Sequence, residues 1–381
     1  MSLITFTAIS FFSISASVQA QRGAAELFAR AQQLQSEGRY EEAANIYEDL
    51  ARRSPASVEV LNNLGVVYAR AGKYRQAATA YERALRLEPR SIPLLVNLGL
   101  AYFKGEDFDK AVKPFARAVA AEPNNSQART LLAMSYYGSG KFAEAGRELE
   151  KLVAADPSNS TLQYLLAQSY LWSGQYEKVI QIFESLLRQQ PDSAAAHILM
   201  GEAYDGLDRT NQAIQEFRTA AQIAPSQPNV HFGLGYLYWK QKKFDEAEQE
   251  FRKELKNDPA HAQAKAYWGD VYVRRRDFAS ATRLLEEALK LRADIRIAHL
   301  DLGIIRTAEK QYEKAIAALK QAVRLDPAQA DAHYRLSIAY QAMGRPQDAA
   351  AERKEVARLQ QKTREDLLHK ISGPPPAPAV E

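Results

Sequence analysis

The chain has 381 residues, 46% of them hydrophobic, with 50 Lys and Arg against 46 Asp and Glu and a formal net charge of +4. This near balance argues against a nucleic-acid-binding protein and against an enzyme specialised for acidic substrates. Because the sequence has no cysteine, it excludes disulfides, thiolate metal sites, cysteine nucleophiles and a lipid-anchored cysteine.

The first residues differ in composition from the rest of the chain. An uncharged apolar stretch runs from Leu3 to Ile14, and small polar residues then lead to Val18-Gln19-Ala20, an acceptable small-x-small cleavage site. This segment predicts a secretory signal peptide over residues 1–20, although its leading part has no Lys or Arg. The alternatives are an uncleaved anchor and a cytosolic protein. A signal peptide on a repeat protein of this kind is typical of a bacterial protein that is periplasmic or extracellular.

The stretch from Val58 to Ser91 fits two short amphipathic helices separated by Gly72. On the first helix, four residues recur at helical spacing and share one face: Leu61, Leu64, Gly65 and Tyr68. On the second helix, the shared face consists of Ala77, Tyr81, Ala84 and Leu85. Pro89 ends the second helix. Neither helix can bury its apolar stripe alone, so the pair must pack against copies of itself.

Copies of this helix pair follow one another with a step of 34 residues, as from Pro55 to Pro89. The proline that ends each second helix recurs as Pro55, Pro89, Pro123, Pro157, Pro191, Pro225, Pro259 and Pro327, with Ala293 in its place once. The small residue of the first helix recurs as Gly65, Gly99, Ala133, Ala167, Gly201, Gly235, Gly269 and Gly303. This spacing predicts one solenoid over residues 21–363, built of ten repeats of 34 residues that start near residue 24.

The repeated Leu64-Gly65-x-x-Tyr68 first helix and the Ala111-x-x-x-Phe115 second helix, closed by proline, resemble the tetratricopeptide repeat family. The resemblance covers roughly residues 24–363 without insertions. It implies an all-α, right-handed superhelical solenoid of tandem helix-turn-helix repeats. It also implies a binding scaffold whose first helices line a concave, peptide-binding groove, but it does not identify the partner.

The end of the chain departs from the repeat. In the tenth repeat, Arg353 replaces the large apolar residue of the second helix, as expected of a solubilising cap. Residues 364–371 are predicted to prolong this helix. The last residues, 372–381, read S-G-P-P-P-A-P-A-V-E and predict a disordered, polyproline-like tail.

The side of the first helix opposite the core should be polar in a simple amphipathic helix. Here it carries apolar side chains at Val96, Leu100, Phe103 and their repeat equivalents, which we call the groove positions. We predict that a peptide binds to Phe103, Met134, Tyr137, Tyr164, Leu171, Trp172, Ile198, Phe232, Tyr236 and Trp239. The alternative is that some of them pack between neighbouring first helices. We expect the more exposed members to be Phe103, Tyr137, Trp172 and Trp239.

Acidic residues fall on the same face in the later repeats and could meet basic side chains of a partner: Glu202, Asp205, Asp270 and Asp301. Histidines share one repeat position at His197, His231, His299 and His333. Neighbouring first helices lie about 8–10 Å apart, too far for two matching imidazoles to share an ion easily. We therefore expect packing histidines, no metal site and no cofactor.

The sequence also lacks a phosphate-binding glycine loop and a nucleophile motif, so we expect no catalytic residues and no enzyme. The predicted function is a non-catalytic scaffold that captures a protein segment in its groove. The alternative is an accessory subunit that assembles, or presents substrates to, an envelope machine such as a pilus, secretion, polysaccharide-export or glycosyltransferase complex. Neither nucleic-acid binding nor membrane insertion of the mature chain is expected. The sequence leaves the oligomeric state open.

Overall fold

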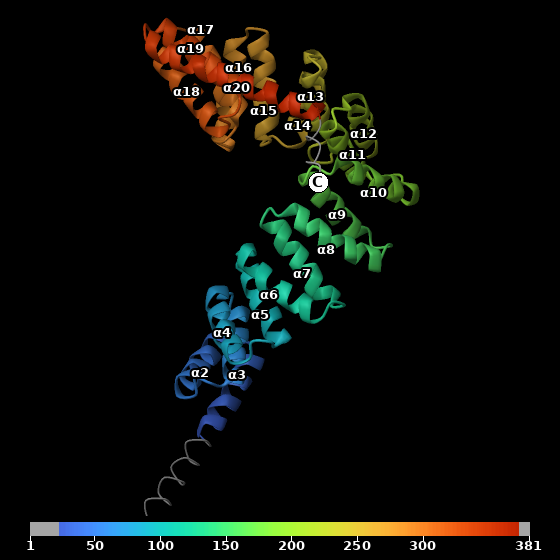
Figure 1. Cartoon of the computed structure of the whole chain (residues 1–381), viewed down its shortest axis with the longest axis vertical. Coiled ribbons are helices and arrows are strands. Elements are labelled where there is room, and N and C mark those ends of the chain that lie inside the picture. The colour runs from blue at the N-terminus through green and yellow to red at the C-terminus, as the bar shows by residue number, and fades with distance from the viewer. Residues whose placement is uncertain (1–22, 373–381) are drawn as a thin grey trace, which may run out of the picture. The chain divides into compact units, whose positions relative to one another are not determined.

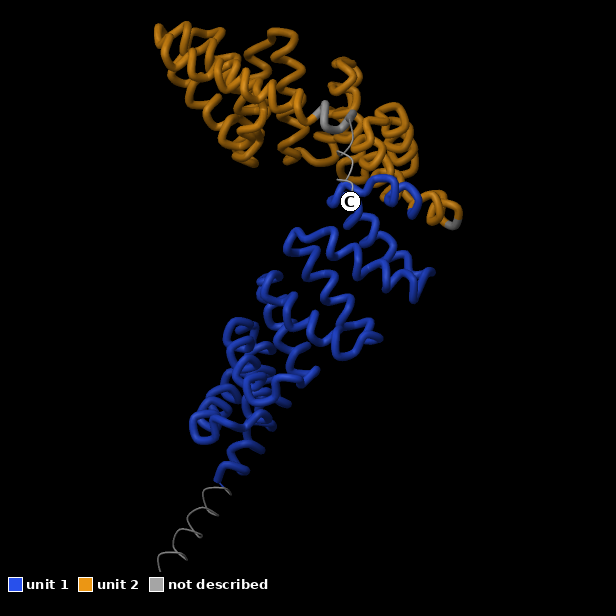
Figure 2. The backbone as a smooth tube through the Cα atoms, viewed as in Figure 1, with its two compact units in different colours: residues 1–182 blue, residues 183–381 orange. Residues whose placement is uncertain are grey.

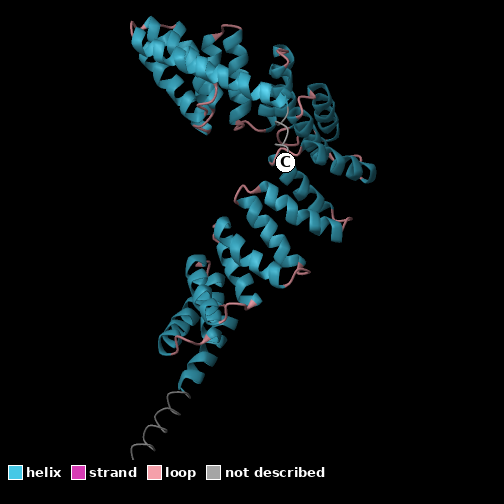
Figure 3. Cartoon of the chain, viewed as in Figure 1, coloured by secondary structure: helices cyan, strands magenta, loops and turns pink. Residues whose placement is uncertain are grey.

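The computed structural model describes residues 23–372, and every regular element in this range is a helix (Figures 1 and 3). The predicted signal peptide and residues 373–381 of the predicted tail lie outside the described residues. A helix over residues 23–36 is followed by α2 (Tyr40–Arg53), α3 (Val58–Arg70), α4 (Tyr74–Leu87), α5 (Ile92–Lys104), α6 (Phe108–Ala121), α7 (Ser126–Gly138), α8 (Phe142–Ala155), α9 (Ser160–Trp172), α10 (Tyr176–Gln189), α11 (Ala194–Gly206), α12 (Thr210–Ile223), α13 (Val230–Lys240), α14 (Phe244–Asn257), α15 (Ala262–Arg274), α16 (Phe278–Leu291), α17 (Arg296–Ala308), α18 (Tyr312–Leu325), α19 (Ala330–Ala342) and α20 (Pro346–Ser372).

The chain divides into two compact units, residues 1–182 and 183–381, with the boundary inside α10 (Figure 2). Within each unit, the first and second helices of a repeat pack against each other, as in α5 and α6 or α17 and α18. First helices of successive repeats also touch, as do α3 and α5 in the N-terminal unit and α15 and α17 in the C-terminal unit. This confirms the all-α solenoid of tandem helix-turn-helix repeats expected from the sequence.

A single backbone conformation turns the chain between the two helices of each repeat. The residue at this turn has a positive φ, and it is glycine in five repeats: Gly38, Gly72, Gly140, Gly174 and Gly344. Five other repeats place a side chain there: Glu106, Asp208, Lys242, Arg276 and Lys310. Backbone hydrogen bonds close the turn in the same way in both classes. The turn is therefore imposed by the packing of the helix pair and not by glycine alone.

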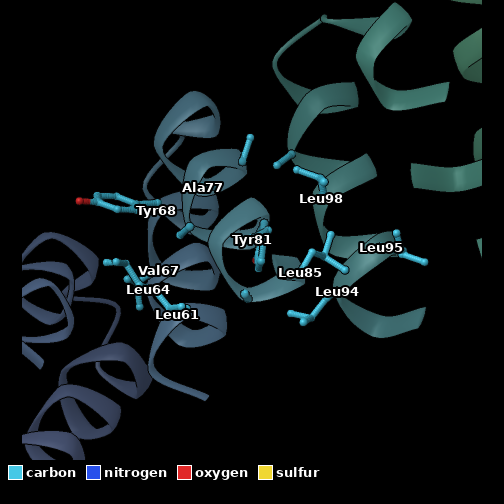
Figure 4. Close-up of a cluster of buried hydrophobic side chains, with 14 of the residues drawn as sticks. Leu61, Leu64, Val67, Tyr68, Ala77, Tyr81, Leu85, Leu94, Leu95 and Leu98 are labelled. Atoms are coloured by element: carbon cyan, nitrogen blue, oxygen red, sulfur yellow. The ribbon is translucent and has the colours of Figure 1, made fainter. Parts of the chain in front are cut away.

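The small residue of the first helix allows the second helix of the same repeat to approach closely. A Cβ built on Gly65 would lie 2.5 Å from the Tyr81 ring, and one on Gly235 would lie 2.6 Å from the Phe251 ring. Such distances are impossible without a shift, so the aromatic ring fills the space that a side chain would occupy. Figure 4 shows how leucines of α3 and α5 and Tyr81 of α4 gather in one core of the N-terminal unit.

The start of α13 is the clearest departure from the repeat. The helix begins only at Val230, after Asn229 with a φ of +67°, and has 11 residues instead of the 13 of α11 or α15. Glu254 of α14, 1% exposed, accepts hydrogen bonds from the backbone N–H of Asn229 at 3.0 Å and of Phe232 at 3.1 Å. A carboxylate at a helix N-terminus satisfies free N–H groups and complements the helix dipole. Glu254 therefore takes the place of the missing first turn.

The helices of residues 23–372 include none with the length and apolar content that a membrane crossing requires.

Candidate functional site

The groove positions of the N-terminal unit carry a row of aromatic contacts. The Phe103 ring meets Phe108 edge-on with centroids 5.3 Å apart, and Tyr137 meets Phe142 in the same way at 5.2 Å. Phe142 in turn stacks on Trp172 at 6.0 Å. Each of these contacts joins a first helix to the first residue of a second helix. The row therefore fixes the orientation of its rings before any partner binds.

The exposure of these side chains is uneven. Trp172 is 63% exposed and Met134 is 38% exposed, whereas Phe103 and Tyr137 are half-buried. Tyr164 and Leu171 are also half-buried. Trp172 lies one position beyond the repeat equivalent of Phe103. It is more exposed than the other predicted groove residues of the N-terminal unit.

In the C-terminal unit the predicted aromatic residues pack together in one cluster of rings. Phe232, Tyr236 and Trp239 of α13 are half-buried, and all three contact Tyr267 of α15, with ring centroids 5.9, 5.5 and 4.9 Å apart. The sequence pattern did not single out Tyr267. Burial, and then the neighbouring Tyr236, raise the pKa of Tyr267 to about 12. These rings hold α13 and α15 together, and the exposed edges that remain line the surface.

Ile198, one of the predicted groove residues, is buried in the structure, with an exposure of only 8%. The physical reason is that α11 and α13 touch, and side chains lying between two first helices are covered.

Two of the four predicted acidic residues are also buried. Asp270 is 4% exposed and accepts hydrogen bonds from the indole N–H of Trp239 and from Nε of Arg274, both at 2.5 Å. Asp301 is 2% exposed, and its carboxyl group lies against that of Asp270. Burial, and then the charge of Asp270, raise the pKa of Asp301 well above its ordinary value. The sequence pattern placed both carboxylates on the groove face of the first helices. In the structure both are buried there.

The other two acidic residues remain at the surface. Glu202 is exposed, and Asp205 is half-buried and accepts a hydrogen bond from Nζ of Lys240 at 2.8 Å. This hydrogen bond, with that to Asp208, raises the pKa of Lys240. Lys240 ends α13, next to the turn that holds Lys242 and Lys243. Its charge is paired with Asp205 and Asp208.

A cavity of about 640 Å³ lies among α15, α17 and α19. Its lining combines apolar and charged side chains: Asp270, Val273, Arg274, Arg276, Phe278, Leu300, Asp301, Ile304, Thr307, Ala308, Asp331, Arg335 and Ile338. A second cavity of about 390 Å³ extends to Trp239 and Tyr267. It shares four lining residues with the first: Asp270, Arg274, Leu300 and Asp331.

The sequence prediction ended at α13 and missed the apolar residues of this region. Tyr334 is 51% exposed and Ile338 is 36% exposed, both on α19. They occupy the repeat positions of Val96 and Leu100, and Leu300 and Ile304 occupy the same positions on α17. Counting in steps of 34 residues to the last repeat would have found all four.

The repeated histidines make hydrogen bonds to a paired second helix or to the turn before their own helix. Nδ1 of His197, His231 and His333 lies 2.6 Å from Glu216, Glu250 and Glu352 on the paired second helix. Nε2 of His299 lies 2.8 Å from the carbonyl oxygen of Ala293. Among residues 23–372, no cluster of His, Asp and Glu side chains is arranged to hold a metal ion. His197, His231 and His333 thus join the two helices of a repeat, whereas His299 bonds to the turn before α17.

Three family models of the tetratricopeptide repeat match the chain. One matches residues 68–134, 136–203 and 206–266, another matches residues 28–92, and a third, described as the TPR repeat, matches residues 303–344. The chain belongs to the tetratricopeptide repeat family. This family membership supports a protein-interaction scaffold, a role that is in general non-catalytic.

Solved structures with tetratricopeptide repeats resemble this chain at low sequence identity. The Cut9–Hcn1 hetero-tetramer structure of the APC/C is 14% identical with a TM-score of 0.50, over 87% of this chain and 86% of that chain. Yeast Tom70 is 15% identical with a TM-score of 0.45, over 91% and 94%. YrrB, described as a TPR protein with an unusual peptide-binding site, is 19% identical with a TM-score of 0.38, over 49% and 97%. No curated protein matches the sequence. At these identities the likeness concerns the tetratricopeptide fold alone.

Proposed function

We propose that this tetratricopeptide repeat chain is a non-catalytic scaffold that captures a segment of a partner protein on the surface formed by its first helices. One observation carries the proposal. Among the side chains that the structure describes, six large hydrophobic ones are exposed, and four of them lie at or beside the groove positions: Met134, Trp172, Tyr334 and Ile338. Apolar and aromatic side chains on a rigid surface are suitable anchors for a peptide.

The other two exposed hydrophobic residues provide an internal comparison. Leu87 and Leu291 end the second helices α4 and α16 and are 42% and 49% exposed. Each stands at the end of its helix, away from the groove positions. Exposed apolar surface is thus concentrated on the first helices, as capture of a segment requires.

Site-specific photo-crosslinking tests the proposal. The photoreactive residue benzoylphenylalanine is placed at Trp172, at Ile338 or at Leu291, the last as the second-helix control of comparable exposure. The full-length chain is irradiated in extract of its native cells, and adducts are identified by mass spectrometry. We expect Trp172 or Ile338 to capture one defined peptide of a partner that Leu291 does not. Capture of the same partner at Leu291 alone would move the binding site to the second helices and overturn the proposal.

A further inference from the structure

The carboxylate of Asp270 accepts hydrogen bonds from side chains of three successive first helices. It is 4% exposed, and the indole N–H of Trp239 on α13 donates to it at 2.5 Å. Arg274, one turn further along α15, donates from Nε at 2.5 Å and from Nη2 at 3.2 Å. The third donor is the carboxyl group of Asp301 on α17. One buried side chain thus joins α13, α15 and α17.

The contact between Asp270 and Asp301 requires a proton. A carboxyl group donates a hydrogen bond only when it is protonated, and two buried carboxylates in contact cannot both be ionised. Burial, and then the charge of Asp270, raise the pKa of Asp301, which is 2% exposed, well above its ordinary value. Asp270 is the better placed of the two to carry the charge, because Trp239 and Arg274 both donate to it. The proton therefore belongs to Asp301.

The charges around the pair are largely compensated by one another. The charged and titratable groups that face Asp301 come from its own helix, from α15 with the turn after it and from α19: Tyr267, Asp270, Arg274, Arg276, Arg296, Asp331 and Arg335. Helices α16 and α18 also pack against α17, and the described lining of the cavity includes no charged residue from either.

The cations among these groups are directed elsewhere. Arg274 is bound by Asp270, and Arg296 forms an ion pair with Asp331. The guanidinium of Arg335 lies over the ring of Tyr334, 5.8 Å from its centroid. The charges of Arg274 and Arg335 favour an ionised Asp301, but burial and Asp270 oppose them more strongly. An ionised Asp301 would therefore be a second buried carboxylate without a cation of its own.

We propose that Asp270 and Asp301 form a proton-dependent joint between α15 and α17, closed while Asp301 holds its proton and opened when the proton is lost. Loss of the proton removes the hydrogen bond and leaves two like charges in contact. Asp301 lines the cavity of about 640 Å³, and water that enters there solvates the new charge as the two helices separate. Because α17 carries Leu300 and Ile304 at groove positions, pH then sets the shape of this part of the first-helix surface. This regulation goes beyond the proposed segment capture and does not depend on it.

The sign of this pH dependence is opposite to that of a salt-bridged carboxylate. The pKa of Asp301 is raised by folding, so the stability that the joint contributes is complete below the ordinary pKa of 3.8 and is lost as pH rises through the raised pKa. A carboxylate paired with a cation stabilises instead as pH rises. The direction of the effect therefore identifies its source.

Amide hydrogen exchange of α17 in the full-length chain tests this proposal between about pH 4 and about pH 9, with protection factors that correct for the intrinsic pH dependence of exchange. In Asp301→Asn the amide has similar size, donates an N–H to Asp270 at every pH and cannot ionise. We expect the protection factors of the wild type, relative to Asp301→Asn, to fall by up to about tenfold per pH unit between the ordinary and the raised pKa, as for the loss of one proton. Glu313→Gln, which makes the same change at an exposed position of α18, is the matched control and should follow the wild type.

The NMR signal of the Trp239 indole N–H gives a second readout, because this group donates to Asp270 beside Asp301. The signal should titrate in the wild type with a midpoint well above pH 3.8 and stay unchanged in Asp301→Asn. Parallel protection profiles of the wild type and Asp301→Asn would overturn the proposal. If Asp301→Asn fails to fold, the wild type still decides: an indole signal that does not titrate between about pH 4 and about pH 9 contradicts the shared proton. The crosslinking experiment on segment capture is independent of both readouts, so either proposal can fail while the other stands.

Discussion

Glu254 offers the most direct test of how the second-helix residues position the candidate surface. Its carboxylate is 1% exposed and accepts the backbone N–H groups of Asn229 and Phe232, which α13 cannot satisfy within the helix. A hydrogen bond to a charged group contributes about 1.5–3 kcal/mol. Glu254→Ala loses two, and the cost of burying the carboxylate is relieved at the same time, so we expect a loss of about 3 kcal/mol.

Glu254→Gln should cost roughly half as much, because the amide retains one acceptor oxygen but turns an NH₂ group toward the second N–H. Gln249→Ala, at an exposed position of the same helix, is the control and should change stability by no more than about 0.5 kcal/mol. Urea unfolding measures the free energy, and amide hydrogen exchange reports whether α13 itself opens.

The loss of Glu254 should also increase amide hydrogen exchange at the residues that precede Phe232. Because α13 carries Phe232 and Trp239, their ring contacts with Tyr267 should weaken as well. A free energy of unfolding for Glu254→Ala within about 1 kcal/mol of the wild-type value would refute this role of Glu254. Amide exchange that increases elsewhere while that of α13 stays unchanged would refute it as well.

Three further predictions concern the repeat scaffold. Gly235→Ala should destabilise by about 1–3 kcal/mol in urea unfolding, because the new Cβ would lie 2.6 Å from the Phe251 ring; unchanged stability would contradict the close-packing role of glycine. Lys310→Gly should stabilise by about 0.5–1 kcal/mol in thermal unfolding, since φ is +61° at this turn, and a loss of stability would refute it. Burial, and then the hydrogen bond to Glu48, raise the pKa of Tyr68 to about 12. The stability that protonated Tyr68 contributes is therefore complete below the ordinary tyrosine pKa of 10 and is lost as pH rises through 12. Tyr68→Phe should therefore reduce the loss of stability in this alkaline range.

The sequence predicted the fold well because one helix pair is repeated with a constant step. The small residue at Gly65 and the aromatic ring at Tyr81 are in direct contact, so their joint recurrence is itself a packing signal. The late start of α13 was not predictable in the same way. It depends on Glu254, which lies 25 residues after Asn229 and reaches it only through the fold.

The candidate site was predicted less completely. Helical spacing gives the direction of a side chain but not the depth at which it lies, and for this reason Ile198, Asp270 and Asp301 were placed at the surface although they are buried. Tyr334 and Ile338 were missed for a different reason: they occupy groove positions in the last repeat, which was interpreted as a polar cap. Their recurrence in the sequence was sufficient to identify them.

The dissociation constant of the crosslinked partner segment tests the proposed capture most directly. It should be measured for the wild type, for the first-helix variant Trp172→Ser/Tyr334→Ser/Ile338→Ser and for the second-helix variant Leu87→Ser/Leu291→Ser, whose residues are also exposed. Capture on the first helices predicts that the first variant binds about 30-fold more weakly, as for the loss of a principal anchor, and that the second binds like the wild type. Equal affinity of the first variant and the wild type would show that the segment binds elsewhere.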